Sequence, residues 1–354
     1  MSKKKIRIKD IAQLAGVSVG TVDRVLHKRG KVSEEALRKV QDTLRAIEYK
    51  PNLIARTLGS KKIYRIAALI PDPSLDEYWN LSYLGIGQAE EEWAQYDFHV
   101  EPFFFNLYDS NSFRSVAEAV CASAPDGILV APVFYQEALP FFGLFKANGI
   151  PYVLFNTNIP EVEPLSFIGQ NLFESGKVGA ELLYLQQNTS GTFALLHINE
   201  NSLNSVHLLE KERGFKEYFR ENNPQADIQV LDSGNGDGAS VEKRIGELLL
   251  HPELKGILVT TSKAIPLVSS LLEKHGKRDI RLVGYDLLEE NIHYLKTGVV
   301  NFLINQNPKR QAFLGITYLA NYLLLKKEPP RTDLFPLEII TRQNLKSYLE
   351  SEIH

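Results

Sequence analysis

The chain has 354 residues, of which 44% are hydrophobic and 23% are charged, a size that suits two or three folded domains and a composition ordinary for a globular protein. The basic N-terminus leads into charged residues, and no stretch reaches the roughly 18 uninterrupted apolar residues of a membrane helix, so we expect neither a secretory signal nor a membrane span. The net charge of −3 conceals a basic front, because residues 1–62 carry 16 Lys and Arg against 6 Asp and Glu, whereas the remainder carries 24 against 37.

This segregation of charge indicates a basic module on an acidic body. Such a module is what binding to the phosphates of a nucleic acid requires, and the binding should weaken steeply with salt.

The first predicted unit is a pair of short helices, the first of which begins near Ile8. Apolar residues recur at helical spacing in two runs, namely Ile11, Leu14 and Ala15, then Val22, Val25 and Leu26. Gly16 separates the runs and can take a positive φ at the end of the first helix, and Ser18 can cap the second. The pattern predicts a helix-turn-helix.

The second helix carries the candidate DNA contacts on its N-terminal turns, the part of a recognition helix that meets base edges in the major groove. Arg24 can donate two hydrogen bonds to a guanine, and Thr21 is short enough to bind a phosphate. The alternative is a helical hairpin in an ordinary core, with Arg24 a solvated charge. The candidate residues here are Ser18, Val19, Gly20, Thr21, Asp23, Arg24 and His27.

A third helix and a short hinge segment complete this front part. Ser33 is a capping residue for the third helix, whose apolar positions are Leu37, Val40, Leu44 and Ile47. Residues 52–58, which follow Pro51, predict a helix of barely two turns that is too short to persist alone in water.

Three segments in order and spacing resemble the headpiece of the lac repressor (LacI/GalR) family of bacterial transcription regulators. They read AGVSVGTVDRVL at residues 15–26, VSEEALRKV at residues 32–40 and YKPNLIARTL at residues 49–58. The resemblance implies a hinge helix that orders when two subunits pair on DNA, with Leu58 at the position of the leucine that wedges into the minor groove. Asn52 and Ala55 belong to the same candidate contact segment.

Departures from the family pattern affect operator preference. Before the first helix the family usually has Ser or Thr, whereas this chain has Arg7. In the recognition helix Asp23 replaces the usual Ser, and His27 replaces the usual Asn. Operator preference therefore cannot be copied from relatives.

From Tyr64 onward, apolar runs alternate with amphipathic helical stretches, which predicts parallel strands buried on both faces. The predicted strands span residues 65–70, 98–105, 126–130, 151–155, 166–168, 192–198, 228–231, 256–259, 281–284 and 301–304.

The series restarts near Leu165, which predicts two doubly wound α/β lobes with a cleft between them. The resemblance likewise implies a periplasmic-binding-protein-like domain behind the all-α headpiece. We expect the headpiece in residues 1–62, lobe 1 in residues 63–164 and 291–328, and lobe 2 in residues 165–290 and 329–354. Residues 337–341 should return to lobe 2. No leucine heptad repeat follows them, so we do not expect the tetramer-forming tail that some relatives have.

Ligand-binding candidates follow the predicted strands, because ligands of open α/β sheets bind beyond the carboxyl ends of strands. Tyr78 and Trp79 follow the first strand, and a flat ring packs on the C–H face of a sugar, although one ring could simply cover the core. Asn156, Asp286 and Gln306 match effector-contacting positions of the family and can bind adjacent hydroxyls. For Asp286 the alternative is a cap on the next helix.

Two further candidate positions depart from the family pattern. Three residues before Gly214 the family usually has an arginine that binds the ligand, whereas this chain has Lys211, with Arg213 beside the glycine as a substitute. Thr261 stands where an asparagine is common.

Catalytic and metal-binding motifs are not evident. There is no Walker loop, GxSxG elbow or HExxH motif, and the eight histidines lack metal-ligand spacing, so we expect no enzyme and no cofactor. Gly234, Gly236 and Gly238 lack GxGxxG spacing and predict a turn. His197, at a strand end, either lines the cleft or lies in the core. The lone Cys121 excludes an internal disulfide and is expected in the core of a cytoplasmic protein.

The sequence therefore predicts a homodimeric DNA-binding repressor that reads an inverted repeat and binds a small sugar in its cleft. Two headpieces on an inverted repeat need a twofold partner, and cleft closure would change the separation of the hinge helices. One alternative is the same regulator with a purine or nucleoside effector. Another is a solute-binding transport protein, but such a protein would not need a DNA-binding headpiece.

Overall fold

The computed structural model describes residues 8–26, 30–47, 62–185, 191–198, 204–234 and 238–351. The chain divides into two units, Met1–Lys61 and Lys62–His354, within one residue of the expected boundary. No helix in the described ranges has both the length and the apolar character needed to cross a bilayer.

The smaller unit is the predicted helix-turn-helix with its third helix. Its helices are α1 (Ile8–Ala15), α2 (Val19–Leu26) and α3 (Glu34–Ala46). Gly16 has a φ of +64° after α1, a conformation that strains residues with a Cβ. The Ser18 hydroxyl accepts a hydrogen bond from the Thr21 N–H at 3.1 Å, and Ser33 caps α3 through the Ala36 N–H. The predicted turn and both caps are confirmed.

The core of the smaller unit is narrower than predicted. It contains Ile11, Ala12, Ala15, Val22 and Val40, with Val25, Leu26, Leu44 and Ile47 partly buried against it. The predictions for Leu14 and Leu37 were wrong, because 62% and 37% of these residues are exposed. At about 100° per residue, Leu14 lies roughly 100° from the centre of the stripe formed by its buried neighbours on α1.

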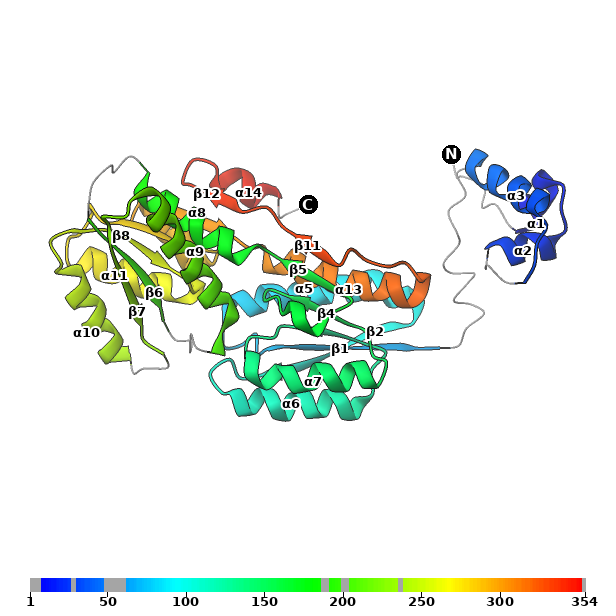
Figure 1. The fold of residues 1–354 in the computed structure, drawn as a ribbon, viewed down its shortest axis with the longest axis horizontal. Helices are drawn as coiled ribbons and strands as arrows, with labels where there is room; N and C mark the ends of the chain where they lie inside the picture. The colour runs from blue at the N-terminus through cyan, green and yellow to red at the C-terminus, as the bar shows by residue number, and fades with distance from the viewer. Residues whose placement is uncertain are drawn as a thin grey trace. The chain divides into compact units, whose positions relative to one another are not determined.

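The first lobe of the larger unit is a six-stranded parallel sheet in the order β11-β5-β4-β3-β1-β2. Helices α5 and α13 pack on each other over one face, and α6 and α7 cover the other (Figure 1). The strands are β1 (Tyr64–Pro71), β2 (Phe98–Phe105), β3 (Gly127–Val130), β4 (Tyr152–Phe155), β5 (Ser166–Gly169) and β11 (Thr332–Leu334). The helices are α5 (Glu77–Trp93), α6 (Ser110–Ser123), α7 (Tyr135–Ala147) and α13 (Pro308–Leu325).

The second lobe is a six-stranded sheet in the order β12-β10-β9-β8-β6-β7, parallel except for β12. Alternate residues of β6 face α8 and α9 on one side and α10 and α11 on the other. The strands are β6 (Thr192–His197), β7 (Asp227–Asp232), β8 (Leu254–Val259), β9 (Arg281–Tyr285), β10 (Phe302–Asn305) and β12 (Glu338–Ile340). The helices are α8 (Leu172–Tyr184), α9 (Val206–Asn222), α10 (Gly238–Leu249), α11 (Ile265–Lys274), α12 (Glu289–Thr297) and α14 (Leu345–Ser351).

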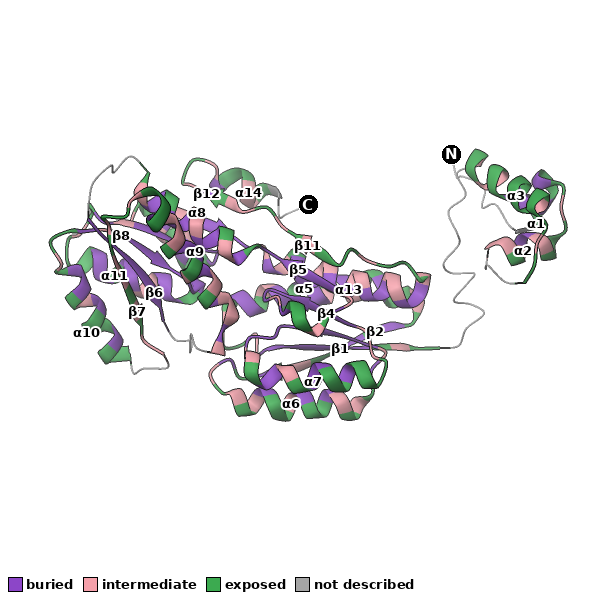
Figure 2. Cartoon of the chain, in the orientation of Figure 1, coloured by how far each residue is buried: buried purple, intermediate pink, exposed green. Residues whose placement is uncertain are grey.

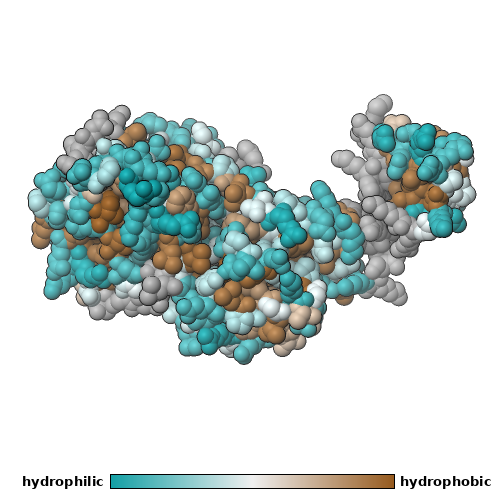
Figure 3. All heavy atoms as spheres, viewed as in Figure 1, coloured by the Kyte–Doolittle hydropathy of each residue, from teal (hydrophilic) through white to brown (hydrophobic). Residues whose placement is uncertain are grey.

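The strands form the core of both lobes. Six of the eight residues of β1 and all four residues of β3, β4 and β5 are buried, and the outer faces of α6 and α7 are exposed (Figure 2). Burial on both faces explains the continuous apolar runs of the sequence. On the face drawn in Figure 3, hydrophilic residues surround smaller hydrophobic areas. Cys121 is half-buried on α6, less buried than expected.

All ten predicted strands are present, but the predicted lobe boundaries were wrong. Strand β5 pairs with β4 in the first lobe, α12 and β10 lie in the second lobe, and β11 returns to the first. The chain therefore crosses between lobes at residues 170–171, 306–307 and 335–337. Hydrophobic patterning identifies a buried strand but does not specify which neighbouring strand it pairs with.

Candidate functional site

Helix α2 presents the predicted contact residues on its N-terminal turns. Ser18, Val19, Gly20 and Arg24 are exposed, whereas Thr21 and Asp23 are half-buried. The Thr21 hydroxyl lies 2.8 Å from the Ser18 hydroxyl, so both groups help to shape the turn. His27, Asn52, Ala55 and Leu58 lie outside the described residues.

A pocket lies between the two lobes at the carboxyl ends of their strands. It encloses about 590 Å³ of unfilled space, part of it open to solvent. Six predicted ligand contacts line it, namely Tyr78, Trp79, Asn156, Lys211, Thr261 and Gln306. The other lining residues are Asp76, Leu107, Tyr108, Val133, Ile198, His207, Thr260, Ser262 and Lys263.

Two aromatic rings at the start of α5 form one wall of the pocket. The Asp76 carboxylate caps this helix by accepting the Tyr78 N–H at 2.9 Å, which fixes the first turn. The Tyr78 and Trp79 rings meet edge to face with centroids 5.0 Å apart, and Trp79 also meets Phe155 edge to face at 6.0 Å. Both residues are almost buried, so only part of each ring is available to a ligand.

Asn156 follows β4 with a φ of +67° and is held by four hydrogen bonds. Its N–H donates to the Ile168 carbonyl oxygen at 3.1 Å and to Gln311 Oε1 at 2.9 Å. Its Nδ2 donates to the Tyr78 hydroxyl at 2.6 Å, and its Oδ1 accepts from Thr157 at 3.0 Å. The side chain therefore has a fixed orientation at the pocket wall.

Lys211 is the cation on α9 that reaches the pocket, although it is only 2% exposed. Its Nζ donates to the Thr260 carbonyl oxygen at 3.1 Å and lies 3.6 Å from the centroid of the Tyr285 ring. A compact ammonium group thus stands where the family arginine was expected.

Asp286 does not line the pocket, contrary to the prediction. It is fully buried with a φ of +63°, and its carboxylate accepts hydrogen bonds from the Ser262 hydroxyl, the Gln306 N–H and Gln306 Nε2. The backbone of Asp286 is in the left-handed region, and its carboxylate is hydrogen-bonded to Gln306, where the chain crosses between the lobes. Burial raises the pKa of Asp286, while those hydrogen bonds and the Lys211 charge act to lower it. Its carboxylate therefore positions pocket residues; the N-cap of α12 is Leu288.

Arg213 was also predicted wrongly as a pocket residue. Its side chain is 64% exposed, forms an ion pair with Glu210 at 2.9 Å and lies over the Phe173 ring. Residues two apart on a helix differ by about 200°, so Arg213 and Lys211 point to opposite sides of α9.

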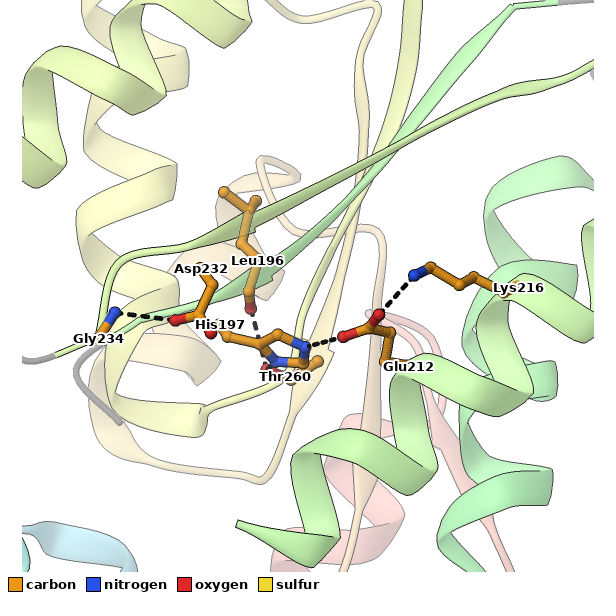
Figure 4. A network of polar contacts seen from close by, with 7 residues as sticks. All are labelled: Leu196, His197, Glu212, Lys216, Asp232, Gly234 and Thr260. Atoms are coloured by element: carbon orange, nitrogen blue, oxygen red, sulfur yellow. Dashed lines mark hydrogen bonds and ion pairs between the residues drawn. The ribbon is translucent and has the colours of Figure 1, made fainter. Parts of the chain in front are cut away.

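His197 lies behind the pocket wall in a buried polar network (Figure 4). Its Nε2 lies 2.9 Å from Glu212 Oε2, and its Nδ1 lies 2.8 Å from Thr260 Oγ1. Lys216 donates to the other Glu212 oxygen at 2.5 Å. Burial lowers the pKa of His197, and Glu212 offsets part of that effect. His197 is therefore a core residue that supports Thr260.

Hydrogen bonds at the pocket and away from it join the lobes. Lys263 Nζ donates to the Leu75 carbonyl oxygen at 2.6 Å and to the Tyr108 hydroxyl at 3.0 Å. Outside the residues that line the pocket, Asn204 Nδ2 in lobe 2 donates to Glu137 Oε2 in lobe 1 at 2.6 Å. Lys263 was not selected from the sequence. It lies two residues after Thr261, so a search over more residues after β8 would have included it.

Gln311 was missed because it lies inside α13, where no strand end marks it. It is 1% exposed, accepts the Asn156 N–H and donates to the Gln306 carbonyl oxygen at 2.8 Å. It thus connects two of the predicted pocket residues. Within the described ranges, no three His, Cys, Asp or Glu residues are grouped as a metal site would require.

Comparisons with known proteins agree with this division of the chain. Residues 7–52 match the family described as bacterial regulatory proteins, lacI family, and residues 66–328 match the periplasmic binding protein domain. The sucrose operon repressor of Streptococcus mutans is 25% identical over 347 residues, covering 96% of this chain and 99% of the relative. The ribose operon repressor of Halalkalibacterium halodurans is 27% identical, covering 79% of this chain and 80% of the relative.

A solved structure from Bacteroides fragilis, assigned as a LacI transcriptional regulator, is similar to the larger part of this chain. The two are 31% identical with a TM-score of 0.76, over 81% of this chain and 100% of that one.

Proposed function

Because this chain belongs to the lacI family of bacterial regulatory proteins and is a DNA-binding transcriptional regulator, we propose that it is a repressor controlled by a small carbohydrate-like effector. The observation that carries the proposal is the union in one chain of an exposed helix-turn-helix and a two-lobed body with a ring-lined polar pocket. A regulator of transcription acts on the chromosome, so we place it in the cytoplasm.

The proposed reading surface is the exposed part of α2. Arg24 is exposed there, whereas Val22 beneath it is buried in the core and fixes the helix. Binding sites selected from a random DNA pool would provide the operator. Arg24→Ala should then weaken operator binding by about 1–3 kcal/mol and relax base preference at one position. Lys39→Ala, which removes an equal charge from α3, should preserve base preference; equal loss of preference in both variants would contradict the assignment.

The hinge contact proposed for Leu58 has a separate test. An apolar wedge acts only on a correctly placed, bent duplex, so Leu58→Ala should weaken specific binding and spare non-specific binding. Fluorescence anisotropy with selected and scrambled duplexes measures both. Equal loss on the two duplexes would remove Leu58 from the proposed interface.

A sugar-like effector is supported by the chemistry of the pocket. Rings at one wall can cover the C–H face of a sugar, while Asn156, Gln306 and Lys211 supply amide and ammonium groups for hydroxyls. Two relatives are named as repressors of sucrose and ribose operons. A purine would favour parallel rings on both of its faces, whereas Tyr78 and Trp79 meet edge to face on one wall.

A thermal-shift screen against sugars, sugar phosphates and purines tests the effector class. A ligand at one hundred times its dissociation constant adds roughly 2.7 kcal/mol of stability. A shift with sugars that Trp79→Ala abolishes supports the proposal, and a shift confined to purines overturns it. Any ligand found this way should change the affinity of the protein for DNA by a certain factor, and DNA should change the affinity of the protein for that ligand by the same factor.

A homodimer reading an inverted repeat is the proposed assembly, and lobe 1 offers a surface for it. Tyr83 and Leu84 on α5 and Phe104 on the edge strand β2 are 38%, 51% and 36% exposed, and the Tyr83 and Phe104 rings meet at 5.3 Å. Exposed apolar groups beside a sheet edge favour association. Leu84→Asp should give monomers in analytical ultracentrifugation, whereas Leu144→Asp on α7 should not.

A further inference from the structure

The three segments that connect the two lobes meet at one buried side chain, Gln170. This residue lies in the first crossing, between β5 and α8, and is 3% exposed. Its Nε2 donates to the carbonyl oxygen of Asn305, the last residue of β10 directly before the second crossing, and to the Pro336 carbonyl oxygen, in the third, both at 2.9 Å. The amide group of this residue in the first crossing therefore bonds to the segments of the other two crossings.

This arrangement restricts how the lobes can rotate. A hinge motion changes backbone angles in the connecting segments and so moves them relative to one another. The two N–H bonds of a primary amide have a fixed geometry, and hydrogen bonds weaken steeply when they bend. Both carbonyl oxygens can accept from Gln170 only while the crossings keep their present spacing.

The other half of the same amide has no such partner. Gln170 Oε1 is buried and accepts no hydrogen bond from the part of the chain that the structure describes. A buried acceptor without a donor costs free energy, because it has lost its hydrogen bond to water. Rotation of the lobes would break a bond to one crossing but would let water reach this oxygen, so the two effects oppose each other.

We propose that Gln170 is the positioning residue of the hinge between the lobes. Its two donated hydrogen bonds favour the present arrangement, in which Lys263 and Asn204 form hydrogen bonds between the lobes. Its unpaired oxygen keeps that preference small, so that a bound effector can shift it. The last step rests on the proposed function, whereas the hinge role does not.

The direct test measures lobe opening without DNA or effector. Spin labels at Ala147→Cys in lobe 1 and Lys274→Cys in lobe 2, both exposed positions, report the lobe separation in a Cys121→Ser background. Gln170→Met keeps the chain length but removes both donors, and it should broaden and shift the distance distribution. Gln95→Met is the matched control, because Gln95 Nε2 bonds within lobe 1 to the Glu92 carbonyl oxygen.

A second readout uses the pocket itself. Trp79 lines the pocket at 4% exposure, and in a Trp93→Phe background it is the remaining tryptophan of the chain. Opening should raise its acrylamide quenching constant at least twofold in Gln170→Met. A mere loss of stability would lower the unfolding temperature without changing quenching well below that temperature.

The outcomes decide the proposal. Unchanged distances and quenching in Gln170→Met, or an equal change in Gln95→Met, overturn it. If Gln170→Met does not fold, Gln170→Asn is the second variant, because it keeps the amide group on a side chain one methylene shorter. It should open the lobes partially. A spin-label distance distribution equal to that of the parent protein would overturn the proposal. Failure of the parent protein to bind DNA would overturn the proposed function and leave this measurement intact.

Discussion

Replacing Lys211 with methionine should destabilise the larger unit in a pH-dependent way. The ammonium is 2% exposed and lies near a fully buried carboxylate, Asp286, whose pKa its charge acts to lower. Methionine fills a similar volume but supplies neither charge nor donor. Leaving a buried polar group without its partner costs about 1–3 kcal/mol, and more for a charged group, and Asp286 would lose a charge that favours its ionised form. The Thr260 carbonyl oxygen also loses its donor.

The sign of the pH dependence follows from Asp286. Burial raises the folded-state pKa of this carboxyl above its ordinary value of 3.8, and loss of Lys211 should raise it further. The protonated carboxyl needs no counter-charge, so a raised folded-state pKa favours the fold at low pH, and that stability is lost as the pH rises through the pKa. The destabilisation caused by Lys211→Met should therefore be largest near pH 8 and smaller near pH 5.

Urea denaturation at pH 5, 6.5 and 8, followed by circular dichroism, measures this difference. Lys216→Met on the same helix is the control, because Lys216 is 52% exposed and its pair with Glu212 should contribute about 0–1 kcal/mol. A loss in Lys211→Met that is equal at all three pH values would refute the reasoning, because it would indicate a packing defect and no electrostatic link to Asp286.

Three further predictions concern other parts of the chain. Gly85→Ala should cost about 1–3 kcal/mol in a urea titration, because the new Cβ would lie 2.0 Å from the Lys309 carbonyl oxygen, whereas Gly87→Ala meets no atom within 4 Å and should stabilise α5 by about 0.5–1 kcal/mol. Burial lowers the folded-state pKa of His197 below its ordinary value of 6.5. The free energy of unfolding should therefore decrease as the pH falls from 6.5 toward the folded-state pKa. His197→Gln should show a smaller decrease in the same urea denaturation series. Ile11→Ala should cost the headpiece about 2–5 kcal/mol and leave the calorimetric transition of the larger unit in place; a shift of both transitions would show that the two units unfold together.

Local patterns were sufficient to predict the helix-turn-helix and the strands. Gly16, Ser18 and Ser33 act within a few residues of themselves, and the buried strands are continuous apolar runs, so the sequence contains the whole signal. Lobe membership depends on pairings between distant segments, such as β5 with β11 across more than 160 positions. No local pattern specifies such a pairing, which is why the crossings were predicted wrongly.

The pocket was predicted as a region more reliably than residue by residue. The rule that ligands bind beyond strand ends selected Tyr78, Trp79, Asn156 and Gln306, because every parallel strand of a lobe ends at the same edge. The other two predicted lining residues, Lys211 and Thr261, came from the family resemblance. The same rule does not distinguish a side chain that faces the pocket from one that turns back, as Asp286 does. Helical periodicity alone would have excluded Arg213, because Lys211 on the same helix was already assigned to the cleft.

The pocket residues and the lobe crossings form one hydrogen-bonded system. Asp286 in lobe 2 holds Gln306 at the second crossing, Gln306 accepts from Gln311 in lobe 1, and Gln311 accepts the N–H of Asn156, which in turn bonds Tyr78. A ligand that draws on Asn156 or Gln306 therefore acts on the segment that must move when the lobes rotate. For this reason a variant of Asp286 can lose effector binding without the carboxylate ever touching the effector, and affinity alone cannot assign contact. Only a comparison of affinity with lobe separation, measured in the same variant, separates the two roles.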